Sequence, residues 1–247
     1  MSSEVLAAPK LGEGLVLVRS ADSRIFAFGA EDGKRRWVYQ RAAASLIVRS
    51  PVGLTIHQGL AIAGFSGGKL AAIALANGLL RWEATVALPK GATELERVTD
   101  IVGEPAAQGR EVCAAAYQGR VACYDFQNGN QLWAREMSTL TGVSFDARYA
   151  FISDDKGAVH ALDRGNGRSI WKQDRLSHRQ LSLPLALGTE IAIGDLQGYV
   201  HFLARESGAF VARAATDGSP VRAAPLKLAD GFLVQTQGGG LYALSLN

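Results

Sequence analysis

This 247-residue chain has two cysteines and four histidines, the residue types that most often form disulfides, bind metals or transfer protons. Cys113 and Cys123 flank a turn at 118–119, so paired strands could bring them opposite each other as a disulfide in an oxidising compartment. Small buried thiols are the favoured alternative, because a free cysteine packs as a compact hydrophobe. The sequence therefore predicts free thiols in the core and leaves the disulfide as the second choice.

His160 and His201 occupy equivalent positions, each three residues after a glycine. Two imidazoles at matching positions could bind a metal, but no cysteine or carboxylate completes a ligand set, so we predict that both pack on a strand face. No Ser-His-Asp spacing, phosphate-binding loop or pair of acids stands out. The sequence thus predicts no catalytic residue, no metal and no cofactor.

Charge is nearly balanced, with 26 Lys and Arg against 23 Asp and Glu. The basic residues are scattered, and the densest cluster, Lys34-Arg35-Arg36, lies beside a turn glycine. We expect no nucleic-acid partner, because phosphate binding needs a basic face. No apolar run approaches the roughly 18 residues of a membrane span, and the first residues do not resemble a signal peptide.

A repeated phrase runs through the chain. Aligned on the small residue of its first turn, the copies are marked by Ser23, Gly68, Gly119, Gly157, Gly198 and Gly239. In the first five copies a second glycine follows ten residues later, at Gly33, Gly78, Gly129, Gly167 and Gly208. All four tryptophans fall fourteen residues after the first turn, at Trp37, Trp82, Trp133 and Trp171. They are 45, 51 and 38 residues apart, so the module is constant while the loops vary.

Each period contains short apolar runs separated by turn glycines, and in the second copy these are SPVGLTI, GLAIAGF, GKLAAIAL and GLLRWEATV. Four strands in a repeat of about 40 to 50 residues are typical of a β-propeller blade. The tryptophan falls on the outermost strand, where its ring can wedge against the neighbouring blade. The sequence predicts an all-β propeller of four-stranded antiparallel blades, with residues 1–247 as a single domain.

The sixth copy lacks its tryptophan position, because the chain ends at Asn247. We therefore expect about five and a half blades. An open ring would leave blade faces uncovered, which repeat arrays tolerate badly, so we also expect the chain to be a fragment of a larger ring.

The phrase ALDRGNGRSIW carries a pattern, AxDxxxGxxxW, that resembles the repeat of quinoprotein-type (PQQ-like) propellers. Two branches share it: dehydrogenases that bind pyrroloquinoline quinone, and the BamB family of outer-membrane assembly lipoproteins. Four stretches resemble the BamB family in the same order, namely ERVTDIVGEP, AYQGRVACYDFQNGNQLWARE, DRLSHRQLSLPLAL and IGDLQGYVHFLARESGAFVA. The similarity extends from about Pro9 to the C-terminus.

The BamB resemblance implies an eight-bladed propeller, of which this chain would be the C-terminal portion without the signal, the lipid-bearing cysteine and the first blades. It implies a non-enzymatic scaffold at the periplasmic face of the Gram-negative outer membrane, held there only through a lipid anchor. The implied partner is BamA, the β-barrel assembly protein, bound through its periplasmic POTRA domains. The resemblance also implies help in delivering unfolded outer-membrane proteins.

The resemblance places the BamA contact on two neighbouring loops. An apolar-x-apolar-Arg element matches Leu46, Val48 and Arg49, and an acidic pair is matched by Asp100, with Val102 at its second position. Apolar side chains beside an arginine are enriched at binding hot spots, and an aspartate could pair with a partner's cation. The alternative is that the Leu46 segment is simply the buried inner strand of the second blade.

A PQQ-dependent dehydrogenase is the alternative function. A quinone site needs flat stacking surfaces and a Ca²⁺ cage of oxygen ligands. The dehydrogenase branch stacks its cofactor partly on a disulfide between adjacent cysteines, whereas Cys113 and Cys123 are ten residues apart. The sequence therefore favours the scaffold.

Overall fold

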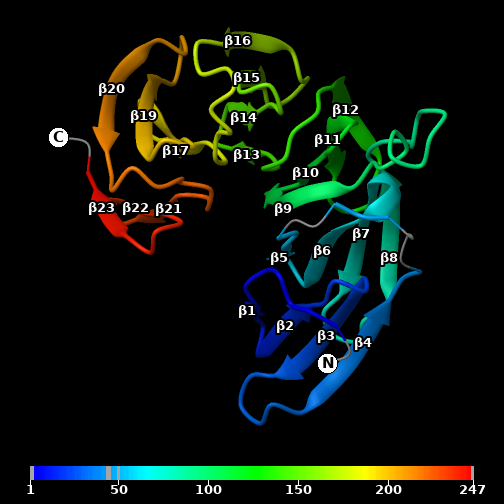
Figure 1. The fold of residues 1–247 in the computed structure, drawn as a ribbon. Coiled ribbons are helices and arrows are strands. Elements are labelled where there is room, and N and C mark those ends of the chain that lie inside the picture. Colours follow the sequence, from blue (N-terminus) through cyan, green and yellow to red (C-terminus); the bar gives the residue numbers. More distant parts are fainter. Residues whose placement is uncertain (1–2, 43–45, 49–50, 246–247) are drawn as a thin grey trace. The chain divides into compact units, whose positions relative to one another are not determined.

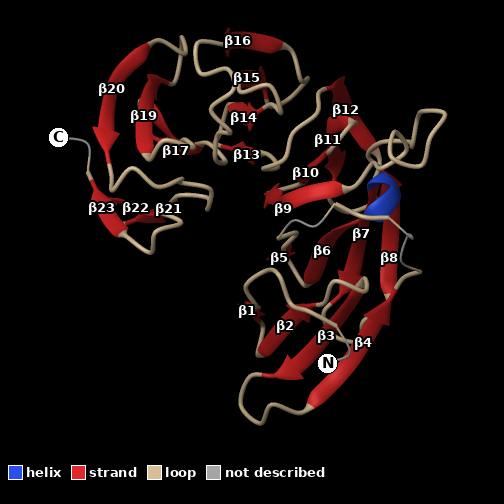
Figure 2. Cartoon of the chain, viewed as in Figure 1, coloured by secondary structure: helices blue, strands red, loops and turns tan. Residues whose placement is uncertain are grey.

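The computed structural model describes residues 3–42, 46–48 and 51–245. These residues form 23 β-strands and one short 3-10 helix, η1 (Ser66–Gly68) (Figure 2). The strands make six antiparallel sheets, five with four strands and the last with three. Strands pair in sequence order within every sheet, so each sheet is a meander joined by hairpins. Among the described residues, the structure has no helix of the length and apolarity that a membrane crossing requires.

The chain divides into two compact units, and the first, Met1–Ser138, holds three of the sheets (Figure 1). Blade one consists of β1 (Lys10–Gly12), β2 (Leu15–Arg19), β3 (Arg24–Gly29) and β4 (Arg35–Gln40). Blade two consists of β5 (Leu54–His57), β6 (Leu60–Phe65), β7 (Lys69–Ala74) and β8 (Leu80–Thr85). Blade three consists of β9 (Ile101–Gln108), β10 (Glu111–Ala116), β11 (Arg120–Asp125) and β12 (Gln131–Glu136). Strand β1 contacts β5, and β5 contacts β9, so the inner strands of these blades are neighbours.

The second unit, Thr139–Asn247, holds the other three sheets. Blade four consists of β13 (Ser144–Phe145), β14 (Tyr149–Ser153), β15 (Val159–Asp163) and β16 (Ser169–Gln173). Blade five consists of β17 (Leu185–Leu187), β18 (Glu190–Gly194), β19 (Tyr199–Ala204) and β20 (Phe210–Ala215). Blade six has β21 (Leu226–Leu228), β22 (Gly231–Gln235) and β23 (Leu241–Leu244). The predicted half blade is confirmed, since blade six has no fourth strand among the described residues.

Within each compact unit, apolar side chains fill the space between neighbouring blades. Between blades one and two, Leu17 and Ile25 pack in one cluster with Ala63 and Phe65, and all four are fully buried. Short and branched side chains suit this position because each blade presents one pleated face to the next and the faces must interdigitate. A single blade could not bury both of its faces alone.

The repeated tryptophan joins one blade to the next. The indole of Trp37 on β4 donates its Nε1–H to the carbonyl of Leu75 in blade two at 2.7 Å, and Trp82 on β8 donates to the carbonyl of Phe126 in blade three at 2.8 Å. Trp171 on β16 makes the equivalent bond to blade five at 2.8 Å. All three rings are buried. The predicted wedge is confirmed for these blades, and it includes a hydrogen bond that the repeat pattern did not reveal.

The two cysteines are joined in a disulfide, so the prediction of free thiols is wrong. Cys113 on β10 and Cys123 on β11 are directly opposite each other in the antiparallel register, and both are fully buried. The hairpin turn between the strands sets this register, which brings the two sulfur atoms together. Spacing alone allowed the pairing but could not fix the register.

Candidate partner-binding site

The loop at 46–48, here called the 46–48 loop, lies between β4 and β5 and belongs to no strand. Leu46 is 44% exposed and Ile47 39% exposed, whereas Val48 is half-buried. The inner strand of blade two is β5, further along the chain. The alternative of a buried inner strand at Leu46 is therefore wrong, and these apolar side chains lie in an exposed loop. Arg49, the third residue expected on this surface, lies outside the described residues.

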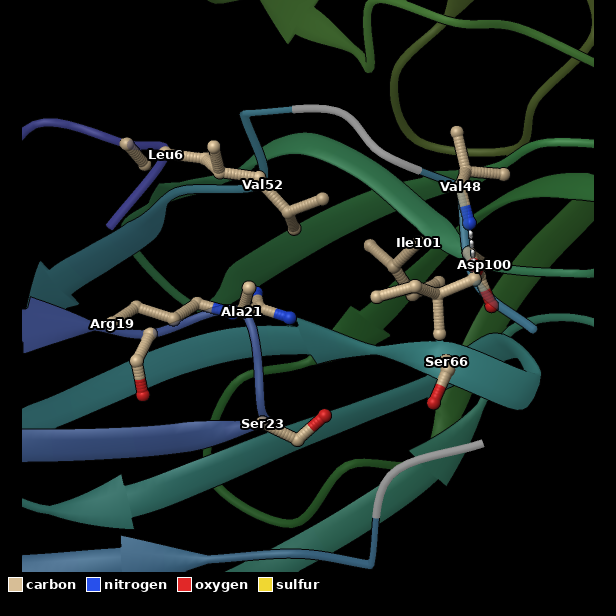
Figure 3. Close-up of a pocket in the computed structure, with 12 residues that line it drawn as sticks. Leu6, Arg19, Ala21, Ser23, Val48, Val52, Ser66, Asp100 and Ile101 are labelled. Carbon is tan, nitrogen blue, oxygen red and sulfur yellow. Dashed lines mark hydrogen bonds between the residues drawn. The ribbon is translucent and has the colours of Figure 1, made fainter. Parts of the chain in front are cut away.

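Asp100 comes directly before β9 and is only 5% exposed. Its Oδ2 accepts a hydrogen bond from the backbone N–H of Val48 at 2.6 Å (Figure 3). Its Oδ1 accepts one from the backbone N–H of Gly67 at 3.2 Å. Such bonds to a carboxylate are stronger than neutral ones. Asp100 thus fastens the 46–48 loop to η1, a role that the sequence did not predict. Its direct contact with a partner stays a prediction.

Val102 occupies the position of the second acidic residue in the expected pair. It is 1% exposed on β9 and pairs with Ala115 on β10, so its side chain belongs to the core. The turn that leads into Asp100 is held by its own side chains: Thr93 Oγ1 accepts the N–H of Glu96 at 3.2 Å, and Glu96 Oε2 accepts the N–H of Thr93 at 3.0 Å. This reciprocal pair is a capping box. It gives the approach to Asp100 a defined backbone path.

A pocket opens beside the 46–48 loop, and Ile47, Val48 and Asp100 form part of its lining. Arg19, the last residue of β2, extends its side chain into this pocket (Figure 3). Its guanidinium carbon lies 5.1 Å from the centroid of the Phe65 ring. Burial lowers the pKa of Arg19 to about 10, and the charge of Asp100 opposes that shift only in part. No motif of the sequence marks Arg19 as part of this site.

Both repeated histidines have a carboxylate partner that the sequence analysis missed. His160 Nε2 lies 2.8 Å from Asp154 Oδ2, and His201 Nε2 lies 2.8 Å from Asp195 Oδ2. Asp195 is fully buried and also accepts a bond from Arg179 at 2.6 Å. Burial alone would raise the pKa of Asp195, but these donors and a backbone N–H outweigh it and lower the pKa to about 2. The available signal was an aspartate three residues before the turn glycine in both copies.

Comparison with known proteins decides the family. The family model described as "Outer membrane protein assembly factor BamB" matches residues 1–173. The chain belongs to the BamB family. The BamB of Bordetella pertussis is 43% identical over 247 residues, which is 100% of this chain and 64% of that protein. The chain therefore spans less than two thirds of the length of this BamB relative.

The crystal structure of BamB from Moraxella catarrhalis superposes on this chain with a TM-score of 0.91 at 26% identity, covering 98% of this chain and 72% of that one. The predicted propeller blades are thereby confirmed. A quinohemoprotein alcohol dehydrogenase from Comamonas testosteroni matches with a TM-score of 0.69 at 16% identity, over 98% of this chain and 46% of the other. That second likeness shows the fold alone.

In this BamB-family chain, the described residues bring Val48 and Asp100 together and place Leu46 on the adjoining surface. The result is an exposed apolar loop whose backbone is held by a buried carboxylate. Such a surface binds by burying apolar area, and a loop that is already held loses less conformational entropy when it does so.

Proposed function

We propose that this chain is a non-enzymatic scaffold in the assembly of outer-membrane proteins and that it binds the periplasmic POTRA domains of BamA. It would act at the periplasmic face of the Gram-negative outer membrane, where unfolded outer-membrane proteins are delivered to the assembly machinery. The names of the relatives, outer membrane protein assembly factors, support this function.

The observation that carries the proposal is the exposure of Leu46 and Ile47 on a loop fastened by Asp100. Exposed apolar residues are common on protein surfaces, but here they adjoin a pocket and lie on a loop whose backbone is held, which are features of interaction surfaces. The carboxylate holds the backbone of the loop in one arrangement before any partner arrives. The binding surface proposed here consists of Leu46, Val48, Arg49 and Asp100. Asp100 contributes by accepting the backbone N–H of Val48, which holds the loop in place.

Calorimetric titration with the isolated POTRA domains of BamA tests the proposal. We expect saturable binding by the wild-type chain and a dissociation constant at least about tenfold weaker for Leu46→Ala and Arg49→Glu, because truncating a hot-spot residue costs more than about 1.4 kcal/mol. Leu79→Ala is the matched control, since Leu79 is also an exposed leucine in a loop, at 63% exposure, but lies in the turn between β7 and β8.

Wild-type affinity in all three variants would show that the contact lies outside the 46–48 loop, while the scaffold function would stand. Absence of binding by the wild-type chain would remove BamA as the partner of this chain.

A further inference from the structure

Arg19 departs from the repeat at a position where the following blades carry small residues. It lies four residues before the turn position, and the equivalent residues of blades two to five are Gly64, Ala115, Ser153 and Gly194. Strand register confirms the equivalence, because Arg19 pairs with Ile25 as Gly64 pairs with Leu70, each two residues after the turn. Blade six has Gln235 at this position. The blade architecture therefore does not require an arginine here, and such departures are expected at functional positions.

One nitrogen of the Arg19 guanidinium, the buried Nη1, has no hydrogen-bond partner among the residues that the structure describes. Asp100 is close enough to favour the charged form, yet its two carboxylate oxygens already accept the N–H groups of Val48 and Gly67. A buried donor left unpaired is costly, so the fold maintains this arrangement at the expense of its own stability.

The pocket around Arg19 has a mixed lining, in which apolar side chains lie beside the cation, Asp100 and three serines. Leu6 and Val52 supply apolar lining, and Ser66 adds a hydroxyl (Figure 3). Ile47 adds to the apolar lining. A planar group with two acceptor oxygens matches the two parallel N–H donors of a guanidinium, and a carboxylate on a methylene stem is the group in proteins that has this form. The stem would contact the apolar lining.

We propose that the Arg19 pocket binds a carboxylate, and that this carboxylate is an acidic side chain of the protein partner that docks on the 46–48 loop. The proposal rests on the proposed function, because Ile47 and Val48 belong both to that loop and to the lining of the pocket. A partner that covers the loop would bring an acidic side chain over the pocket and exclude water from its bond to Arg19.

Arg19→Met tests the proposal, because methionine keeps much of the apolar volume and removes the donors. We expect its titration with the BamA POTRA domains to show binding at least tenfold weaker than wild type, with partial recovery in Arg19→Lys. The midpoint of urea unfolding should stay unchanged or rise in Arg19→Met, because a buried unpaired charge is removed. Arg36→Met is the control, since Arg36 is an exposed arginine of the same blade, paired with Asp32.

Unchanged POTRA binding in Arg19→Met would overturn the proposal while leaving the scaffold function in place. A lowered unfolding midpoint together with weaker binding would also overturn it, because Arg19 would then be a structural residue.

A second probe separates the pocket from the partner. Isovalerate, a small carboxylate with a branched apolar stem, should shift the backbone amide resonances of Val48 and Ser66 saturably, whereas its neutral amide should not. The shifts should vanish in Arg19→Met and persist in Arg36→Met. No response to isovalerate in the wild-type chain would overturn the proposal that the Arg19 pocket binds a carboxylate. A response in a chain that does not bind the POTRA domains would overturn the assigned occupant and identify a site for free carboxylates.

Discussion

Asp154 and Asp195 occupy the same position in consecutive copies of the repeat but collect different donors. Each bonds a histidine six residues later on the adjacent strand. The side chain of Asp195 is fully buried and also bonds Arg179. The side chain of Asp154 is 14% exposed. A buried carboxylate surrounded by donors is favoured in its ionised form, so the donor set decides how much stability each aspartate contributes.

Asp195→Asn should destabilise the chain because it removes the charge while leaving Arg179 and His201 in place. The folded pKa of about 2 lies below the ordinary value near 4, so the ionised group stabilises the fold fully above about pH 4 and progressively loses this effect towards pH 2. We expect a loss of roughly 2 kcal/mol in the free energy of unfolding at pH 7, shrinking below pH 4. Urea unfolding of the wild type and the variant at several pH values measures this difference in the free energy of unfolding.

Asp154→Asn is the matched variant, and the loss should be smaller because its site is more exposed and lacks the arginine. Equal losses for the two variants at pH 7 would show that the extra donor at Asp195 adds nothing.

Asp100→Ala should release the 46–48 loop. The variant removes the acceptors for the N–H groups of Val48 and Gly67 but keeps the backbone carbonyl that accepts the N–H of Tyr117 at 2.9 Å. Hydrogen bonds to charged groups contribute about 1.5–3 kcal/mol, so we expect amide hydrogen exchange at the first two positions to accelerate roughly 10- to 100-fold. The Tyr117 amide is an internal control. Equal acceleration at all three amides would indicate general destabilisation.

Within each compact unit, a tryptophan ring of one blade packs against a turn of the next blade. A side chain at Gly78, in the turn between β7 and β8, would lie 2.8 Å from the Trp37 ring of the preceding blade, and one at Gly129 would lie 2.8 Å from Trp82. Gly33 is at the same repeat position in blade one, and a side chain there would meet nothing within 4 Å. The repeated glycine therefore has two functions, a turn conformation and room for the tryptophan.

Gly78→Ala should cost more stability than Gly33→Ala. Both glycines have positive φ, at 72° and 63°, so both variants carry the penalty of about 1–2 kcal/mol for a left-handed alanine. Only Gly78→Ala also forces the new methyl against Trp37, which adds about 1–3 kcal/mol of overpacking. Urea unfolding of both variants measures the difference, and identical losses would mean that the turn conformation alone selects glycine.

The order and content of the strands could be predicted because glycine and tryptophan recur at fixed offsets within a module that tolerates variable loops. The exposure of Leu46 could not, because an apolar run reads the same in a loop and in a buried strand. Asp100 and Arg19 are brought to the 46–48 loop by the packing of neighbouring blades against each other, which no local spacing records. The disulfide depended on the register of one hairpin, which the ten-residue spacing does not fix.

The same fourteen-residue module occurs in both compact units, before and after Ser138. In the first unit Trp37 bonds the next blade, and in the second unit Trp171 does so. Repeat proteins gain their cooperativity from such nearest-neighbour interfaces. We therefore keep the proposal that residues 1–247 form a single domain, and unfolding can test it.

If the chain is one domain, heat should unfold it in a single transition whose calorimetric and van't Hoff enthalpies agree. Gly78→Ala lies in the first compact unit, and it should shift that entire transition downward. For a loss of about 3 kcal/mol in a chain of this size, the shift is roughly 6–12 °C. Trp171→Phe, which removes an indole bond in the second unit, should lower the same transition. Two transitions, each moved by only one of the variants, would contradict the single domain, because a local perturbation lowers only the melting of the cooperative unit that contains it.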